Sequence, residues 1–298
     1  MLLKVLGTAA GGGYPQWNCA CELCTRARSG VQSCPPRSQD CVAVSGDGEA
    51  WYLLNASLDV ETQIESFVPL HPGPGLRQTP IRGILLTDAE LDHASGLLAL
   101  RQGAILDVFA TESVIDALSQ FLALRTILAA FGTVRWVPVG TDRSFELAGG
   151  VEVRALPLGG APPRYVGTTP GAHWSVAYRM QHHATGGVAI YAPGVGKWSE
   201  SLAQELGQAD CVLMDGTFWS ETEMADTGVG ERSASEMGHL PIGGPAVSAA
   251  RLADLPRPRR IYVHINNTNP ILDEQSEEHA QVVAAGIEVG RDGMELEV

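Results

Sequence analysis

The chain has 298 residues, of which 45% are hydrophobic and 18% are charged, a composition typical of a globular protein with a sizeable core. Its 34 acidic residues against 20 lysines and arginines give a net charge of −14, which argues against binding to nucleic acid or to an anionic membrane surface, because phosphate contacts need clustered Lys and Arg. No apolar run approaches the ~20 residues that cross a bilayer, and residues 1–7 are too short for a secretory signal, so we expect a cytoplasmic protein.

The first expected strand, residues 2–6, leads into the glycine-rich turn Gly7-Thr8-Ala9-Ala10-Gly11-Gly12-Gly13. Its spacing matches neither G-x-G-x-x-G nor the P-loop, and no good helix follows, so phosphate binding is a weak alternative. Glycine permits a tight turn and a close approach of the backbone to a neighbouring group, and we expect that role here.

Three cysteines follow in a C-x-C-x-x-C arrangement, Cys19, Cys21 and Cys24. Thiolates at this spacing can turn their sulfurs toward one point, as tetrahedral zinc requires, and in a reducing compartment the pattern favours a metal site over a disulfide scaffold. Free buried cysteines or a redox pair are the alternative. The fourth ligand is left open among Cys34, Cys41, Asp40 and a distant histidine, although Cys41 begins an expected strand and is expected in the core.

The most informative stretch runs from Ile84 to Gly96, where a short apolar run ends in the charged residues Asp88, Glu90, Asp92 and His93. A buried strand that ends in this way indicates a site, because like charges crowded on one loop cost free energy unless a cation or hydrogen bonds compensate them. An apolar helix is expected to resume at residues 94–100. The alternative is a solvated acidic turn, since loops are commonly polar.

The other apolar patterns alternate between strands and helices. We expect strands at residues 41–44, 51–54, 105–110, 135–139, 145–147, 151–158, 176–180, 187–191 and 210–217, and helices at 60–67, from 112 with Thr111 as cap, at 244–255 and at 277–285. The pair His182-His183 falls in the turn of a hairpin and is interpreted as solvated. Residues 287–298 are expected to form a terminal strand pair that turns at Asp292-Gly293.

Two late strands end in residues suited to a site. One ends in Asp215-Gly216, and another, from Arg260, delivers His264. Three asparagines follow His264 within four residues, and their amides need hydrogen-bond partners in loops or ligands. His239 precedes an expected helix, so it either points into a cleft or caps that helix.

Strands outnumber helices and come in two sets, which suits a β-sandwich flanked by helices. Aligned on Asp92-His93 and Gly96, the charged stretch resembles the H-x-H-x-D-H metal motif of the metallo-β-lactamase fold, with Asp88 and Glu90 in place of the first two histidines. Within that superfamily the chain resembles the coenzyme PQQ synthesis protein B family at residues 7–21, 191–194, 214–219, 237–240 and 264–270. The resemblance implies an α/β fold of the αββα sandwich type, with two mixed β-sheets flanked by helices, as a single domain over residues 1–298.

The chain departs from the hydrolase pattern of this fold. The regions that would supply a further histidine and a bridging aspartate read Leu156-Pro157-Leu158-Gly159-Gly160 and Tyr191-Ala192-Pro193-Gly194, so we do not expect an intact two-metal hydrolytic site. The residues that survive are Asp92, His93 and His264. Two histidines and one carboxylate form the ligand set of non-haem Fe(II) oxygenases, although Zn²⁺ or another divalent metal can occupy the same ligands.

The family resemblance favours iron, because it implies work on a peptide-derived Glu-Tyr precursor of pyrroloquinoline quinone (PQQ) whose ring must be oxygenated with O₂. Asp88 and Glu90 are then candidates to accept protons or to bind the substrate amine, and His239 or Asp215 to position the phenol or orient a ligand. A structural zinc at the three cysteines would pin the N-terminal loop, with Asn267 as an unusual fourth residue.

Two other functions fit the same residues. A zinc hydrolase acting on a PQQ precursor would turn over without O₂, and a non-catalytic carrier of PQQ or its precursor, serving export to the periplasm, would bind its ligand without the Asp92 metal site. The resemblance also leaves open a homodimer and contacts with other proteins of the PQQ pathway.

Overall fold

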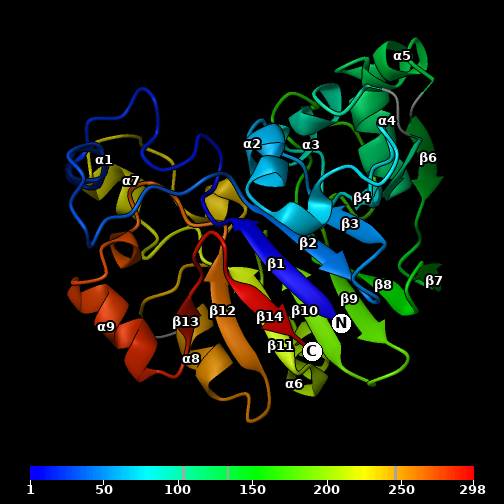
Figure 1. Cartoon of the computed structure of the whole chain (residues 1–298). Helices are drawn as coiled ribbons and strands as arrows, with labels where there is room; N and C mark the ends of the chain where they lie inside the picture. Colours follow the sequence, from blue (N-terminus) through cyan, green and yellow to red (C-terminus); the bar gives the residue numbers. More distant parts are fainter. Residues whose placement is uncertain (103–104, 133, 245–246) are drawn as a thin grey trace.

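Two seven-stranded sheets pack against each other in the computed structural model of the chain, which describes residues 1–102, 105–132, 134–244 and 247–298 (Figure 1). The first sheet has the order β14 (Glu295–Glu297), β1 (Leu2–Gly7), β2 (Cys41–Ser45), β3 (Trp51–Leu54), β4 (Ile81–Leu85), β5 (Leu106–Ala110) and β6 (Val134–Pro138). The second has the order β13 (Glu288–Val289), β12 (Arg259–Val263), β11 (Cys211–Asp215), β10 (Val188–Ala192), β9 (Val176–His182), β8 (Val151–Pro157) and β7 (Ser144–Leu147).

Short helices connect the strands. They are α1 (Glu22–Arg28), α2 (Val60–Glu65), α3 (Leu91–Ala94), α4 (Glu112–Gln120), α5 (Leu124–Ala129), α6 (Glu200–Gln208), α7 (Glu223–Asp226), α8 (Ser248–Ala253) and α9 (Glu277–Ala284), with 3₁₀ turns η1 (Val68–Leu70), η2 (Ser95–Leu98), η3 (Ser235–Met237) and η4 (Pro270–Leu272). Among the described residues, no helix has the length and apolar character needed to cross a membrane.

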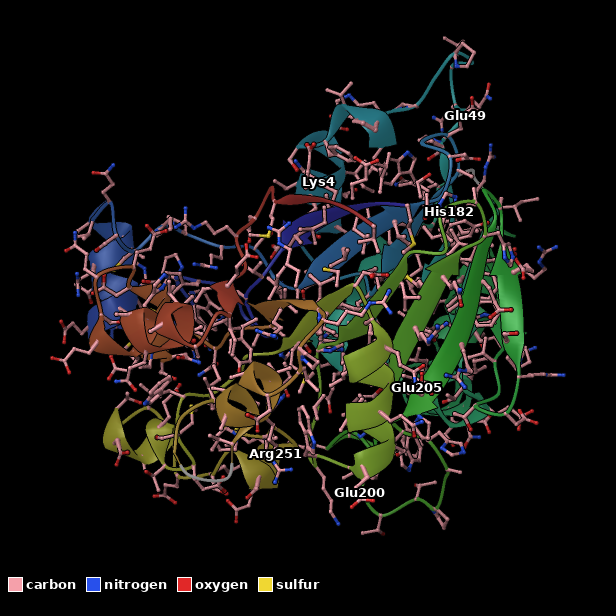
Figure 2. The ribbon with its side chains drawn as sticks, turned by 90° about the horizontal axis from the view of Figure 1, so that it is seen from below. Lys4, Glu49, His182, Glu200, Glu205 and Arg251 are labelled. Carbon is pink, nitrogen blue, oxygen red and sulfur yellow. The ribbon has the colours of Figure 1, made fainter. Side chains whose placement is uncertain are left out.

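Helices cover the outer face of each sheet, so the layers run helix, sheet, sheet, helix (Figure 1). Side chains alternate between the two faces of a strand. On β2, Val42 and Val44 pack between the sheets, whereas Cys41 and Ala43 pack against the helices outside the first sheet. Helix α6, marked by Glu200 and Glu205, lies across the second sheet in the view from below (Figure 2). The predicted αββα sandwich with two mixed sheets is confirmed, and Cys41 is in the core as expected.

Parallel pairing gathers three functional loops at one edge of the sandwich. In the first sheet β3, β4 and β5 are parallel neighbours, and in the second β10, β11, β12 and β13 are. Parallel neighbours end on the same side of a sheet. The loop after β4 carries Asp88 and Glu90 and leads into α3, which carries Asp92 and His93. Asp215 at the end of β11 pairs in register with Val263, the residue before His264. The fold therefore brings the charged stretch and both late strand ends together.

The structure corrects two expectations. The expected terminal strand pair is wrong, because β13 pairs in parallel with β12 whereas β14 pairs antiparallel with β1 in the other sheet, so the Asp292-Gly293 turn carries the chain between sheets. His182 is buried and its Nδ1 lies 3.3 Å from the amino group of Met1 and 3.1 Å from the Thr185 hydroxyl, so only its neighbour His183 is solvated. The sequence pattern could not show that the N-terminus covers His182 and not His183.

The expected helix over residues 94–100 is shorter and irregular. Helix α3 ends at Ala94, and η2 continues from Ser95 to Leu98 around the buried Gly96. The amide of Gly96 donates to the carbonyl oxygen of Ala56 at 2.9 Å, and a Cβ at this position would overlap the carbonyl oxygens of Ser57 and Ala56. Glycine is therefore required where η2 packs against the residues that follow β3.

We predict that Gly96→Ala lowers the free energy of unfolding by roughly 1–3 kcal/mol, because the backbone must move to accommodate the methyl group. Gly207→Ala, in helix α6 with its nearest atom at van der Waals distance, is the matched control and should raise stability by about 0.5–1 kcal/mol. Urea denaturation of both variants measures the two effects. Equal stabilities of the two variants would show that the close approach at Gly96 is not a packing constraint.

Candidate metal centre

Two histidines and one carboxylate meet where the two sheets end. Oδ2 of Asp92 lies 3.3 Å from Nε2 of His264 and 3.8 Å from Nε2 of His93. The rings of His93 and His264 lie 4.9 Å apart, and one possible ligand atom from each of the three residues falls within 4.8 Å of the others. Nε2 of His93 is buried and has no hydrogen-bond partner among the described residues. An unpaired buried nitrogen beside a carboxylate and a second imidazole fits a metal ligand set.

Asp88 lies behind His93. Both of its carboxylate oxygens are 2.8 Å from Nδ1 of His93, and Oδ2 also accepts from the hydroxyl of Thr87 at 2.8 Å. This contact holds the proton on Nδ1 and leaves the Nε2 lone pair for a cation. Burial opposes charge on both partners, but the imidazolium of His93 keeps the pKa of Asp88 below its usual value, while Asp88 and Asp92 raise the pKa of His93 to about 10. Metal binding at His93 therefore releases a proton.

His264 is fixed through its other ring nitrogen and its backbone. The hydroxyl of Thr217 lies 2.8 Å from Nδ1 of His264 and 2.6 Å from Oδ1 of Asp215, so when it donates to the carboxylate it accepts from Nδ1–H. His264 has a φ of 54°, which is strained for a residue with a side chain. The amide of Ile265 donates to Thr8 at 2.8 Å, and the amide of Ala10 donates to Ile265 at 2.9 Å. The end of β1 thereby holds this conformation.

The glycine-rich turn presses against the same centre. A Cβ on Gly11 would lie 3.1 Å from Oδ2 of Asp92, and Gly12 and Gly13 have φ values of 95° and 71°. The expected role of this turn, a tight bend that approaches another group closely, is confirmed. Burial works to raise the pKa of Asp92, but the charge of His93 and the hydrogen bond with His264 lower it well below the usual value. Asp92 is therefore ionised and ready to hold a cation.

Asp215 and His239 form a second pair next to His264. Oδ2 of Asp215 lies 2.8 Å from Nδ1 of His239, whose ring stacks on His264 with centroids 5.4 Å apart. These three residues also have possible ligand atoms within 4.8 Å of one another. Asp215 and Thr217, however, already occupy Nδ1 of His239 and of His264. His239 does not cap a helix, since α8 begins at Ser248, and its ring stacks on His264 instead.

Glu90 lies at the exposed side of the centre. Its amide donates to Oδ1 of Asp88 at 2.9 Å, and the neighbouring carbonyl of Ala89 accepts from Tyr165 at 2.6 Å. Desolvation, followed by the charges of Asp88 and Asp92, raises the pKa of Glu90 to about 7. Of the two expected acid or base residues on this loop, Asp88 is engaged behind a ligand, and Glu90 is the one with a near-neutral pKa.

The three expected zinc ligands also come together. Possible ligand atoms of Cys19, Cys21 and Cys24 lie within 4.8 Å of one another. The side-chain nitrogen Nδ2 of Asn267 lies 3.3 Å from Sγ of Cys19 and 3.4 Å from Sγ of Cys24. Burial is the main cause that raises the pKa of Cys21 to about 12, so metal binding here also displaces protons.

The side-chain amide of Asn267, the fourth residue that the resemblance suggested, thus lies beside these thiols. The other candidates lie elsewhere. Cys34 contacts Ser33 in the core, Cys41 lies 3.3 Å from the carbonyl oxygen of Asn55, and Asp40 accepts a hydrogen bond from Tyr191.

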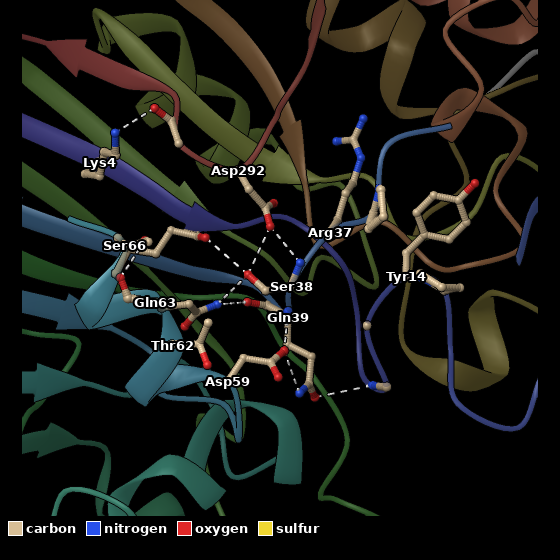
Figure 3. A pocket seen from close by; sticks show the side chains of 16 residues that line it. Lys4, Tyr14, Arg37, Ser38, Gln39, Asp59, Thr62, Gln63, Ser66 and Asp292 are labelled. Atoms are coloured by element: carbon tan, nitrogen blue, oxygen red, sulfur yellow. Dashed lines mark hydrogen bonds between the residues drawn. The ribbon is translucent and has the colours of Figure 1, made fainter. Parts of the chain in front are cut away.

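A pocket of about 570 Å³ lies away from this centre. It is lined by residues that include Gly12, Gly13, Ser38, Gln39 and Gln63, with none of the candidate metal ligands (Figure 3). Its polar side chains bond to one another, as in the donation from the Gln63 amide to the Ser38 hydroxyl at 2.9 Å.

Several supporting residues had no signal of their own in the sequence. Asn55 and Thr87 follow the parallel neighbours β3 and β4, and Asn55 Oδ1 accepts from the amide of Thr87 at 2.9 Å. Tyr191 is fully buried and its hydroxyl accepts from Asn55 at 3.1 Å. Each is one polar residue at the end of, or within, an apolar strand. Only the pairing of the strands shows that Asn55, Thr87 and Tyr191 support Asp88 and His93 from behind.

Comparison with known proteins shows the family of the chain. The family model of the beta-lactamase superfamily domain matches residues 50–265. The chain is 42% identical to coenzyme PQQ synthesis protein B of Azotobacter vinelandii over 100% of both chains, and 42% identical to that of a Pseudomonas fluorescens strain over 99% of both. The crystal structure of Zn²⁺-bound PqqB from Methylobacterium extorquens superposes with a TM-score of 0.93 at 37% identity and covers 100% of both chains.

A diphosphatase of the PhnP family superposes with a TM-score of 0.68 at 20% identity, a likeness of fold alone. The protein is a metallo-β-lactamase-fold member of the beta-lactamase superfamily, with its candidate ligands at the shared edge of the two sheets. Within that superfamily the chain belongs to the coenzyme PQQ synthesis protein B family.

The buried side chain of Glu223 holds the loop at residues 266–269, which carries the three asparagines that follow His264. Glu223 accepts from the amide of Trp219 at 2.6 Å and from the hydroxyl of Thr268 at 2.5 Å. Burial raises the pKa of Glu223 to about 7. A carboxyl whose pKa is raised in the folded state contributes stability at low pH that is lost as pH rises from its unfolded pKa to its folded pKa.

We predict that Glu223→Gln removes this pH dependence. The free energy of unfolding of the variant relative to the native protein should increase between about pH 4.5 and about pH 7 and then level off. Urea unfolding of both proteins across this range makes the measurement. A difference that stays constant with pH would mean that Glu223 titrates normally.

Proposed function

We propose that the protein acts in PQQ biosynthesis as an Fe(II)-dependent oxygenase that hydroxylates the tyrosine ring of a peptide-derived Glu-Tyr precursor. The observation that carries the proposal is the unpaired, buried Nε2 of His93 beside the Asp92 carboxylate and Nε2 of His264. Asp92, His93 and His264 would hold the metal. Iron in such a ligand set, with open coordination positions, supplies redox chemistry with O₂ that redox-inert zinc does not.

The protein's own groups account for proton movement. With Nδ1–H donated to Asp215, Nε2 of His239 is an acceptor that suits the phenol proton of the substrate, and Asp215 stabilises the imidazolium that results. Both the charge of Asp215 and its hydrogen bond outweigh the opposing effect of burial and raise the pKa of His239. Glu90, with a pKa of about 7, is placed on the same loop as Asp92 to take up a further proton or to bind the substrate amine.

The cysteine cluster serves a separate structural role in this proposal. Cys19, Cys21 and Cys24 would hold zinc, with Asn267 beside them. Because Asn267 is three residues beyond His264, a metal there would tie the N-terminal loop to the loop that carries an iron ligand. The relative from Methylobacterium extorquens is Zn²⁺-bound, which supports a zinc site in this family.

The test uses protein purified without air, loaded with Fe(II), and given a Glu-Tyr dipeptide, O₂ and ascorbate. Conversion of each ring C–H to C–OH takes one oxygen atom from O₂, and two electrons and two protons reduce the other to water, so a reductant is required. We predict O₂ uptake with a hydroxylated product by mass spectrometry. His264→Ala should lose bound iron and lower the rate by roughly 100-fold or more while it retains zinc.

The exposed His183→Ala is the matched histidine control and should keep the native rate. Native protein that binds Fe(II) yet consumes no O₂ with the dipeptide would contradict the oxygenase and leave the carrier function in its place.

A further inference from the structure

A buried carboxylate with one unpaired oxygen lies near the metal centre. Asp40, directly before β2, is 1% exposed, and its amide donates to the carbonyl oxygen of Ala9 at 2.7 Å. Oδ2 accepts from the hydroxyl of Tyr191 at 2.7 Å. Oδ1 is buried and has no hydrogen-bond partner in the part of the chain that the structure describes. Half of an ionisable group is thus removed from water without compensation, which is costly for folding.

The surrounding hydrogen bonds leave no donor for this oxygen. Tyr191 has a single hydroxyl proton, which it gives to Oδ2 of Asp40, and it accepts from the amide of Asn55 at 3.1 Å. The same amide donates to Thr87 at 3.0 Å, and Thr87 donates to Asp88 behind His93. The network therefore runs from Asp40 to the back of a candidate metal ligand and directs its protons at two carboxylates.

The charge of Asp40 acts on the centre itself. Burial raises the pKa of Asp40 to about 6, while the charges of His264 and His93 oppose that rise. In turn Asp40 is among the carboxylates that raise the pKa of His93. Between buried groups such charges act over longer distances than at the surface. Among the proposed ligands only Asp92 carries a negative charge, and Asp88 and Asp215 lie behind His93 and His264. Asp40 adds a further negative charge that favours a divalent cation at the centre.

We propose that Asp40 is a buried counter-charge that raises the affinity of the Asp92, His93 and His264 site for a divalent cation, and that the protein keeps it at a cost in stability. The inference rests on the proposed function only in that this site binds a divalent metal. It explains why an acid remains where a neutral residue would fold better: the carboxylate is useful only when a cation is bound.

The test compares Asp40→Asn with the native protein in two measurements. Mn(II) binding, followed by electron paramagnetic resonance with zinc supplied for the cysteines, should weaken by about 10- to 100-fold. Thermal unfolding without Mn(II) should show a stability equal to or above that of the native protein, because the unpaired charge is gone. Asp116→Asn removes one exposed carboxylate from α4 and should change neither.

Tyr191→Phe separates charge from structure. It keeps the Asp40 carboxylate and removes the hydrogen bond, so we expect lower stability with Mn(II) affinity within about threefold of native. If Asp40→Asn does not fold, this variant carries the test, and loss of Mn(II) binding in it would overturn the counter-charge. Unchanged Mn(II) affinity in folded Asp40→Asn would also overturn it. If the His264→Ala variant binds Mn(II) as tightly as the native protein does, that result would instead contradict the metal site of the proposed function.

Discussion

The contact between Asp92 and His264 joins the two sheets at the edge where their parallel strands end. Asp92 comes from α3, shortly after β4, and His264 from the end of β12, and their side chains approach to 3.3 Å. His93 adds a second imidazole to this largely closed space. Ionised groups placed this close and away from water must compensate one another or hold a cation. The surrounding structure can be understood as the means of keeping these three side chains in place.

Each ligand is supported from behind by a different element. Asp88 fixes the tautomer of His93, Thr217 fixes that of His264, and Gly11 leaves room for the carboxylate of Asp92. The positive φ of His264 persists because both the amide and the carbonyl of the next residue, Ile265, are hydrogen-bonded to the backbone that follows β1. The positions of the three side chains are therefore fixed by elements of both sheets, which hold them more rigidly than a single loop would.

The sequence predicted that Asp92, His93 and His264 come together, because an apolar run stops abruptly before each of them. His264 directly follows β12, and Asp92 and His93 lie in α3, a few residues after β4. Such breaks in a hydrophobic pattern are visible without a structure. The network from Asp40 through Tyr191 could not be predicted, because a lone polar residue in an apolar strand reveals its partner only when the neighbouring strand is known. The two short terminal strands were misplaced for a related reason: β13 and β14 have two and three residues, too few to indicate which sheet they join.

Crystals of the protein loaded with Fe(II) without air, with diffraction recorded on both sides of the iron absorption edge, would show whether iron binds at Asp92, His93 and His264. We expect an iron peak bonded to Nε2 of His93, Nε2 of His264 and the carboxylate of Asp92, and no iron at the cysteines. Iron bonded to Asp215 and His239 instead, or found only among Cys19, Cys21 and Cys24, would contradict this expectation.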